Sequence, residues 1–112
     1  MYLTMNRFKV KPGQETAFEA VWQARNSHLR QMPGFVSFDL LRGPEVEGLR
    51  LYASHAVWES EEAFRGWTKS EAFRDSHKTA GAATMREILA GPPQLELFES
   101  VPGLGVSAAE PV

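Results

Sequence analysis

The sequence predicts a small α+β domain in which helices cover one face of a four-stranded antiparallel sheet. Apolar residues alternate with a period of two in four segments, which is typical of strands, and they recur at helical spacing between those segments. The chain has 112 residues, of which 43% are apolar and 23% charged, and these values are ordinary for one folded domain. We expect that domain at residues 1–101 and a loose tail at residues 102–112.

The first strand is predicted at residues 2–10, and the first helix from residue 14 onward. Tyr2, Phe8 and Val10 share one face of the strand, and a proline–glycine pair ends it. The helix is predicted from apolar positions at helical spacing, which are Phe18, Val21, Trp22, Leu29 and Met32. A second proline–glycine pair, at residues 33–34, ends the helix.

Two further strands are predicted at residues 35–42 and 49–58. The segment 43–48 between them contains two glycines and a proline, which suit a hairpin turn with a loop. We therefore expect these two strands to pair antiparallel.

The second half of the chain contains two stretches that begin alike, at residues 60–65 and 70–74. Each starts with a serine followed by an acidic residue, which favours a helix N-terminus, so we expect two consecutive short helices. Gly81 and the segment 91–93 break the chain, and a last strand follows at residues 95–101. The order strand, helix, strand, strand, helix, strand is the ferredoxin-like arrangement.

Apolar residues lie on both faces of every predicted strand, although helices can bury only one face of a sheet. In the first strand, for example, Leu3 and Met5 lie opposite to Tyr2 and Phe8. A second subunit packed sheet to sheet is the simplest cover for the remaining face. We therefore predict a homodimer in which the two sheets form a dimeric α+β barrel.

Charge and composition exclude several classes of function. The formal net charge is -2 with no block of like charge, so we expect no nucleic-acid partner and no membrane partner. The chain has no cysteine, which removes disulfides, thiolate nucleophiles and thiolate metal sites. Arg7 and Lys9 come too early for a signal peptide, and no apolar run approaches the ~20 residues of a membrane span. We expect a cytoplasmic protein.

Asn6, Trp67 and His77 are the candidate functional residues, and each also has a purely structural interpretation. Asn6 lies among apolar positions of the first strand, where its amide needs a partner that is either backbone or a ligand. Trp67 and His77 can share a broad helix face that forms the wall of a pocket. Equally, Trp67 can be a core residue, and His77 can lie at a helix C-terminus, where the dipole favours its charged form.

Other residues give weaker signals. His28 and His55 have no second histidine or carboxylate at metal-ligand spacing, so we assign neither to the site. Arg25 falls in the apolar stripe of the first helix, where it can meet an acidic group or lay its stem across the core. No phosphate-binding glycine loop, nucleophile elbow or paired-carboxylate motif is present, which leaves hydrolase and kinase chemistry without support.

Five short motifs stand in order along residues 2–101. They are Asn6-Arg7-Phe8-x-Val10, Glu19-x-x-Trp22, Pro33-Gly34-Phe35, Trp58-x-Ser60-Glu61-Glu62-x-Phe64-x-x-Trp67 and Ser70-Glu71-x-Phe73-x-x-x-His77. Taken together, they resemble the Isd-type haem-degrading monooxygenases of the antibiotic-biosynthesis-monooxygenase superfamily. The order of elements in that family agrees with the order predicted from periodicity.

The resemblance implies functions for Asn6, Trp67 and His77. In that family a strand asparagine, a helix tryptophan and a helix histidine form the functional triad, and these three residues occupy the matching places. The resemblance implies that His77 is the proximal ligand of haem iron and that Asn6 hydrogen-bonds the oxygen species on the distal side. It also implies that Trp67 presses on the porphyrin and distorts it.

On this resemblance, the chain is a haem-degrading monooxygenase for which haem is both cofactor and substrate. Haem binds between the helices and the sheet, an external reductase or small reductant supplies electrons, and dioxygen oxidises the ring until iron is released. Residues 81–93 are expected to form a mobile cover over the haem edge. Two alternatives stay open: a cofactor-independent monooxygenase of the same superfamily that oxidises a quinol or polyketide, and a non-catalytic haem-binding protein.

Overall fold

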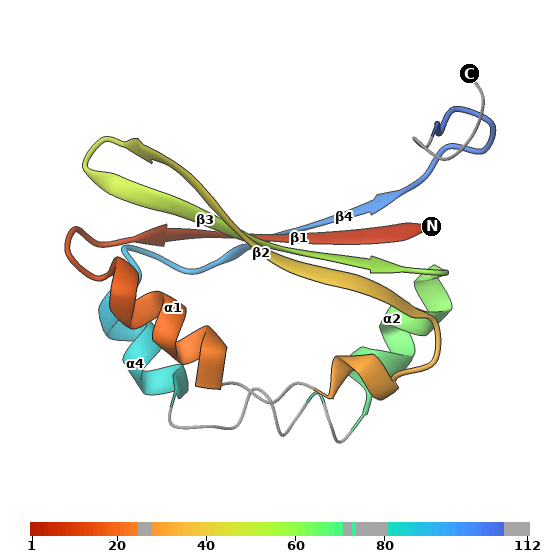
Figure 1. Ribbon diagram of the computed structural model, residues 1–112, viewed down its shortest axis with the longest axis horizontal. Coiled ribbons are helices and arrows are strands. Elements are labelled where there is room, and N and C mark those ends of the chain that lie inside the picture. Colours follow the sequence, from red (N-terminus) through yellow and green to blue (C-terminus); the bar gives the residue numbers. More distant parts are fainter. Residues whose placement is uncertain (25–27, 71–72, 74–80, 107–112) are drawn as a thin grey trace.

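The computed structural model describes residues 1–24, 28–70, 73 and 81–106 (Figure 1). Four strands form one antiparallel sheet in the order β2-β3-β1-β4. The elements in chain order are β1 (Tyr2–Val10), α1 (Glu15–Ala24), the 3-10 helix η1 (Leu29–Gln31), β2 (Phe35–Val46), β3 (Leu49–Trp58), α2 (Glu61–Thr68), α4 (Gly81–Ile88) and β4 (Gln94–Glu99). The predicted α+β class with a ferredoxin-like strand order is confirmed.

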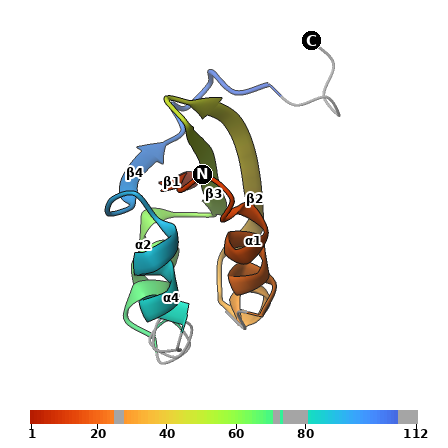
Figure 2. The same cartoon turned by 90° about the vertical axis from the view of Figure 1, so that its left-hand side faces the viewer.

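The helices of the described chain all lie on one side of the sheet (Figures 1 and 2). α1 and α4 pack against each other under one end of the sheet, and η1 and α2 lie under the other end. None of these helices has the length and apolar character needed to cross a membrane. We call the side of the sheet without helices the open face.

β1 runs through the middle of the sheet, and its residues alternate between the two faces as predicted. Tyr2, Thr4, Phe8 and Val10 are buried against the helices, and the odd-numbered residues from Leu3 to Lys9 lie on the open face. Asn6 has the same parity as Phe8, so it lies on the side of the helices. This orientation is the one that a site between helices and sheet requires.

The first helix is shorter than the sequence predicted. α1 ends before residues 25–27, which lie outside the described part of the chain, and η1 is a separate turn. His28, just before η1, has a φ of 56°, a left-handed conformation that a continuous right-handed helix cannot contain. Leu29 and Met32 consequently pack near α2 and not beside α1.

The β2–β3 hairpin has a tighter turn than the loop predicted at residues 43–48. β2 continues through most of this segment, and the turn consists of Glu47 and Gly48, whose φ values are 53° and 81°. Two residues with positive φ are the requirement of a type I′ turn, which matches the twist of the strands. The glycine–proline pair expected in the turn lies at a β-bulge between Arg42 and Glu45.

Both serines that the sequence assigned to helix N-termini act as caps. The Oγ of Ser60 accepts a hydrogen bond from the backbone N–H of Ala63 at 3.2 Å, at the start of α2. The Oγ of Ser70 accepts one from the N–H of Phe73 at 3.1 Å. Phe73 is helical, but the rest of the helix predicted from 70–74 lies outside the described residues.

The sequence did not predict α4. Gly81, which was expected to break the chain, is its first residue. Met85, Ile88 and Leu89 follow at helical spacing and pack with the side chains of α1 and β1. This packing outweighs the low helix propensity of a single glycine at the end of the helix.

Two clusters of buried side chains hold the helices against the sheet. The α1–α4 cluster contains Phe8, Val10, Phe18, Tyr52, Ile88 and Leu89. The α2 cluster contains Tyr2, Ala56, Trp58 and Trp67. Thr4 and Asn6 lie between the two clusters on β1 and belong to neither.

Candidate functional site

Asn6 lies in the middle of the helix-facing side of the sheet. It pairs with Ser54 of β3 on one side and with Leu95 of β4 on the other. Its side-chain oxygen Oδ1 is buried and accepts no hydrogen bond from the residues that the structure describes. Because a buried carbonyl oxygen without a donor costs about 1–3 kcal/mol, a ligand that supplies a donor here is favoured.

A cavity of about 520 Å³ opens beside Asn6, between the sheet and the helices α1 and α4. Its walls include Asn6 and Phe8 from β1, Trp22 from α1, Met85 from α4 and the segment 90–93. Pockets for small molecules measure roughly 300–1,000 Å³ and have mostly apolar and aromatic walls with a few polar groups. The cavity has the size and the chemistry of such a pocket.

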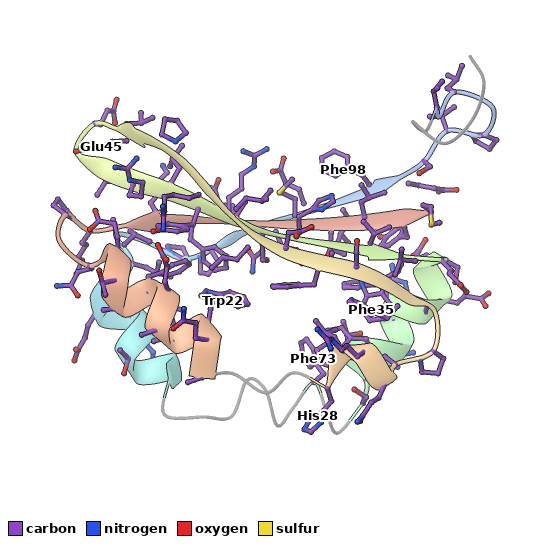
Figure 3. All side chains as sticks on the ribbon, viewed as in Figure 1. Trp22, His28, Phe35, Glu45, Phe73 and Phe98 are labelled. Atoms are coloured by element: carbon purple, nitrogen blue, oxygen red, sulfur yellow. The ribbon has the colours of Figure 1, made fainter. Side chains whose placement is uncertain are left out.

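Trp22 forms the aromatic wall of this cavity. Figure 3 shows its side chain projecting from α1 into the space under the middle of the sheet. Phe35 and Phe73 lie under the same face, at the end near α2. Its ring centroid lies 5.7 Å from that of Phe8, edge to face, and 5.7 Å from that of Phe38, in a stacked arrangement. These contacts fix the plane of the indole, so the wall is rigid.

The wall formed by α4 is attached to β1 through the backbone. The N–H of Lys11 donates to the carbonyl of Ile88 at 2.9 Å, and the N–H of Ala90 donates to the carbonyl of Lys9 at 2.8 Å. Within the segment 81–93, where a mobile cover was expected, the structure therefore shows a helix tied to the sheet and lining the cavity. The mobility of this segment stays a prediction.

Trp67 does not line the cavity beside Asn6. It is 7% exposed in the α2 cluster, stacked on Trp58 with 6.3 Å between ring centroids and in edge contact with Phe73 at 5.4 Å. Tyr2 of the same cluster is four residues from Asn6 on one face of β1, which corresponds to about 13 Å along a strand. Trp67 and Asn6 thus share the layer between sheet and helices, at separate places along it.

His77 and Arg25 lie outside the described residues. Within the part of the chain that the structure describes, no three histidine, aspartate or glutamate side chains come together as a metal site. His28 lies on the far side of the helical layer from the sheet (Figure 3), and His55 lies on the open face, paired with Met5 of β1. Neither of these histidines lines the cavity beside Asn6.

Sequence reasoning missed a polar cluster that joins α1 to the β2–β3 hairpin. The hydroxyl of Tyr52 donates to the carboxylate of Glu19 at 2.5 Å, and the guanidinium of Arg42 donates to the same oxygen at 2.5 Å. The Nε of Arg42 also donates to the Tyr52 oxygen at 3.3 Å. The three residues are far apart in the sequence and follow no local spacing rule, so only the tertiary fold reveals them.

This cluster keeps fixed protonation states near neutral pH. The hydrogen bonds from Tyr52 and then from Arg42 hold the pKa of the Glu19 carboxyl below its ordinary value of 4.5. Burial, and then the hydrogen bond to Glu19, raise the pKa of the Tyr52 hydroxyl above its ordinary value of 10.0. None of these three residues lines the cavity beside Asn6, and the cluster acts as a structural joint between α1 and the β2–β3 hairpin.

Residues 1–79 match the family of antibiotic biosynthesis monooxygenases. The chain belongs to this family. The matched region runs from β1 through α2 and contains Asn6, Trp67 and His77. The resemblance that the motifs indicated is confirmed at the level of the family.

Two relatives within this family carry names that refer to haem. A Mycobacterium tuberculosis protein named heme oxygenase (mycobilin-producing) is 30% identical over 106 residues, which cover 93% of this chain and 95% of the relative. A Staphylococcus saprophyticus protein named heme oxygenase (staphylobilin-producing) is 29% identical over 79 residues, which cover 70% of this chain and 74% of the relative.

Solved structures of similar fold include a porphyrin-bound protein and a cofactor-independent one. A variant of MhuD with two manganese protoporphyrin IX molecules per active site has a TM-score of 0.71 and 26% identity. The match covers 95% of this chain and 100% of the MhuD chain. SnoaB, a cofactor-independent oxygenase from Streptomyces nogalater, has a TM-score of 0.65 and 26% identity, covering 92% and 95%. The chain therefore shares its fold with proteins of different chemistry, and the fold alone does not determine its reaction.

Proposed function

We propose that this chain is a haem-degrading monooxygenase, which binds haem as cofactor and substrate, opens the porphyrin ring with dioxygen and an external reductant, and releases iron. The proposal rests on the cavity beside Asn6, because it combines apolar and aromatic walls with a buried amide oxygen that has no partner among the described residues. The relatives named heme oxygenase support it. We also propose that the protein is cytoplasmic, where a reductase or a small reductant supplies the electrons.

The residues of the cavity fit a haem group. The porphyrin ring is flat and largely apolar, and Phe8, Trp22 and Met85 offer it aromatic and flexible apolar walls. The Asn6 amide presents its oxygen, or its NH₂ group after a half-turn of the amide, at the sheet. Bound haem supplies iron that accepts electrons and activates dioxygen.

We assign separate roles to Asn6, Trp67 and His77. The NH₂ group of Asn6 would donate a hydrogen bond to dioxygen at the cavity wall and so orient it toward the ring. His77 would hold the group through a neutral imidazole nitrogen bound to its iron. Trp67, held in place by Trp58 and Phe73, would contact the bound group from the α2 cluster and not from the walls of the cavity beside Asn6.

The likeness to SnoaB favours a second candidate, the cofactor-independent oxidation of a quinol or polyketide. That reaction uses the same kind of apolar cavity but needs no iron ligand at His77. A non-catalytic haem-binding protein is the third candidate, and it needs His77 but no group that orients dioxygen. The three candidates differ in whether hemin binds and whether it is consumed.

Titration of the purified protein with hemin, followed by ascorbate in air, distinguishes these candidates. We expect a shift of the Soret band on binding and its loss after ascorbate is added. Asn6→Ala should bind hemin but consume it slowly, because the substitution removes a hydrogen bond in the reaction and not the iron ligand. His77→Ala should change the spectrum of bound hemin.

Each contrary result selects a different candidate. If no Soret shift occurs, the cofactor-independent reaction is favoured. If hemin binds but survives ascorbate and air, the protein stores haem and does not degrade it. If His77→Ala leaves the spectrum of bound hemin unchanged, the assignment of the iron ligand is wrong.

We further propose a homodimer joined through the open face. Leu41 and Phe98 on this face are 44% and 50% exposed, and a second cavity of about 500 Å³ is hollowed beside Leu51 and Ala53. A partner packed sheet to sheet buries this apolar surface. Sedimentation equilibrium should show a dimer that Leu41→Glu dissociates and Ala24→Glu, on the exposed side of α1, leaves intact. A monomeric wild-type protein would contradict the proposal.

A further inference from the structure

Arg86 places a positively charged guanidinium group at the cavity beside Asn6. Of the described residues that line this cavity, Arg86 alone carries a charged side chain. It lies in the last turn of α4 and is exposed. The ion pairs within the described chain involve other arginines, namely Arg7, Arg42 and Arg65. Arg86 therefore reaches the cavity with no carboxylate from the described residues paired to it.

The backbone that carries Arg86 is firmly held. Ile88, two residues further on, is 2% exposed in the α1–α4 cluster, and Leu89 is buried beside it. The hydrogen bonds between the end of α4 and β1 fix the chain at the same point. Because the backbone at Arg86 is held, binding by its guanidinium orders the side chain alone and not the segment that carries it.

We propose that Arg86 binds a carboxylate of the ligand and so positions an acidic, planar ligand against Asn6. The inference rests on the proposed function and names the part of haem that is recognised, because haem carries propionate carboxylates on one edge of an apolar ring. An apolar cavity with one unpaired cation fits that distribution of charge. The planar guanidinium pairs with a carboxylate through two parallel N–H···O hydrogen bonds, which fix orientation as well as adding affinity.

The competing explanation is that Arg86 only complements the negative C-terminal end of the α4 dipole. In that case, its removal lowers stability and weakens every ligand equally. A role in binding a carboxylate predicts a loss that depends on whether the ligand has carboxylates. The two explanations therefore differ in ligand preference and not in stability.

The test compares hemin with hemin dimethyl ester, which retains the iron and the ring but has no free carboxylate. Dissociation constants are measured by Soret titration without reductant, so that no turnover occurs. Arg86→Met should weaken hemin binding by about 3- to 10-fold and leave ester binding unchanged. Arg86→Lys should fall between, since it keeps a point charge. Arg30→Met, on the exposed part of η1, is the matched control.

Rising salt should reduce the preference of the wild-type protein for hemin over the ester and have no such effect in Arg86→Met. If Arg86→Met weakens hemin and ester equally, or neither, or if Arg30→Met has the same effect, Arg86 is not the carboxylate-binding residue. These results leave the proposed function in place. If the wild-type protein binds neither ligand, the proposed haem site fails, and the role of Arg86 fails with it.

Discussion

Replacing Asn6 with leucine is expected to stabilise the free protein while greatly slowing its proposed reaction. The Oδ1 atom is buried without a donor among the described residues, and a buried oxygen in that state costs about 1–3 kcal/mol. Leucine is similar in length, carries no polar atom and joins a strand face on which Phe8 and Val10 are already buried. Allowing for interactions lost by the amide NH₂ group, we expect the free energy of unfolding to rise by about 1–2 kcal/mol.

Urea unfolding of the ligand-free protein, followed by circular dichroism at one fixed protein concentration, measures this change. Since urea m-values of small domains are about 1–3 kcal/mol/M, the midpoint should rise by about 0.3–2 M. Thr4→Val, two residues away on the same buried face, is the matched control. Its hydroxyl is not among the buried atoms that lack a partner in the described chain, so this substitution should bring no gain.

A midpoint that falls for Asn6→Leu while Thr4→Val leaves it unchanged would refute the reasoning. It would show that the Asn6 amide is satisfied in the folded, ligand-free protein. Asn6 would then need no ligand to satisfy its buried oxygen. The same variant should bind hemin and consume it much more slowly than the wild type, which the ascorbate assay measures.

Three further substitutions test the fold around the site. Gly34→Ala should destabilise the protein by more than Gly13→Ala, which should cost about 1 kcal/mol. Both glycines have positive φ, but only at Gly34 would an added Cβ lie 2.5 Å from a side chain of α2. Thermal unfolding of the two variants measures the difference. Ile88→Ala should lower the free energy of unfolding by about 2–5 kcal/mol, whereas Glu87→Ala, at an exposed position, should lower it by less than about 0.5 kcal/mol. Equal effects of the two substitutions would mean that α4 does not pack as described. The lowered pKa of Glu19 stabilises the fold above its ordinary value of 4.5, and this contribution is lost as pH falls through the lower folded value. Glu19→Gln should therefore weaken the dependence of unfolding free energy on pH below 4.5, as measured by urea unfolding at several pH values.

The fold class was predictable because side-chain alternation follows directly from strand geometry. Residues of β1 fall on the faces that their parity dictates, and the capping serines Ser60 and Ser70 work through local hydrogen bonds. The errors occurred where a single backbone angle or a tertiary contact decides. The left-handed His28 interrupts a run of helical spacing, and α4 forms across Gly81 because its apolar residues pack on α1. The domain boundary at residue 101 stays a prediction.

The candidate site was predictable only in part. Asn6 was recognisable because a polar residue among apolar positions of a strand contradicts the pattern around it. Trp22 and Met85 were not recognised as cavity walls, because apolar residues at helical spacing look the same whether they fill a core or line a pocket. Arg86 was missed for a different reason, since its place at the cavity depends on a helix that the sequence did not predict.

Because the α1–α4 cluster and the α2 cluster are separate, we expect the concentration of available ligand to affect how long the folded protein survives in the cell. Each end of the sheet has its own packed side chains, and Thr4 and Asn6 at the centre belong to neither cluster. A ligand in the cavity beside Asn6 would contact Asn6 together with Phe8 and Leu89 of the α1–α4 cluster. At a free concentration 100 times its dissociation constant, such a ligand stabilises the folded state by about 2.7 kcal/mol. Cellular proteases, which act on opened molecules, would then remove the protein fastest when its ligand is scarce.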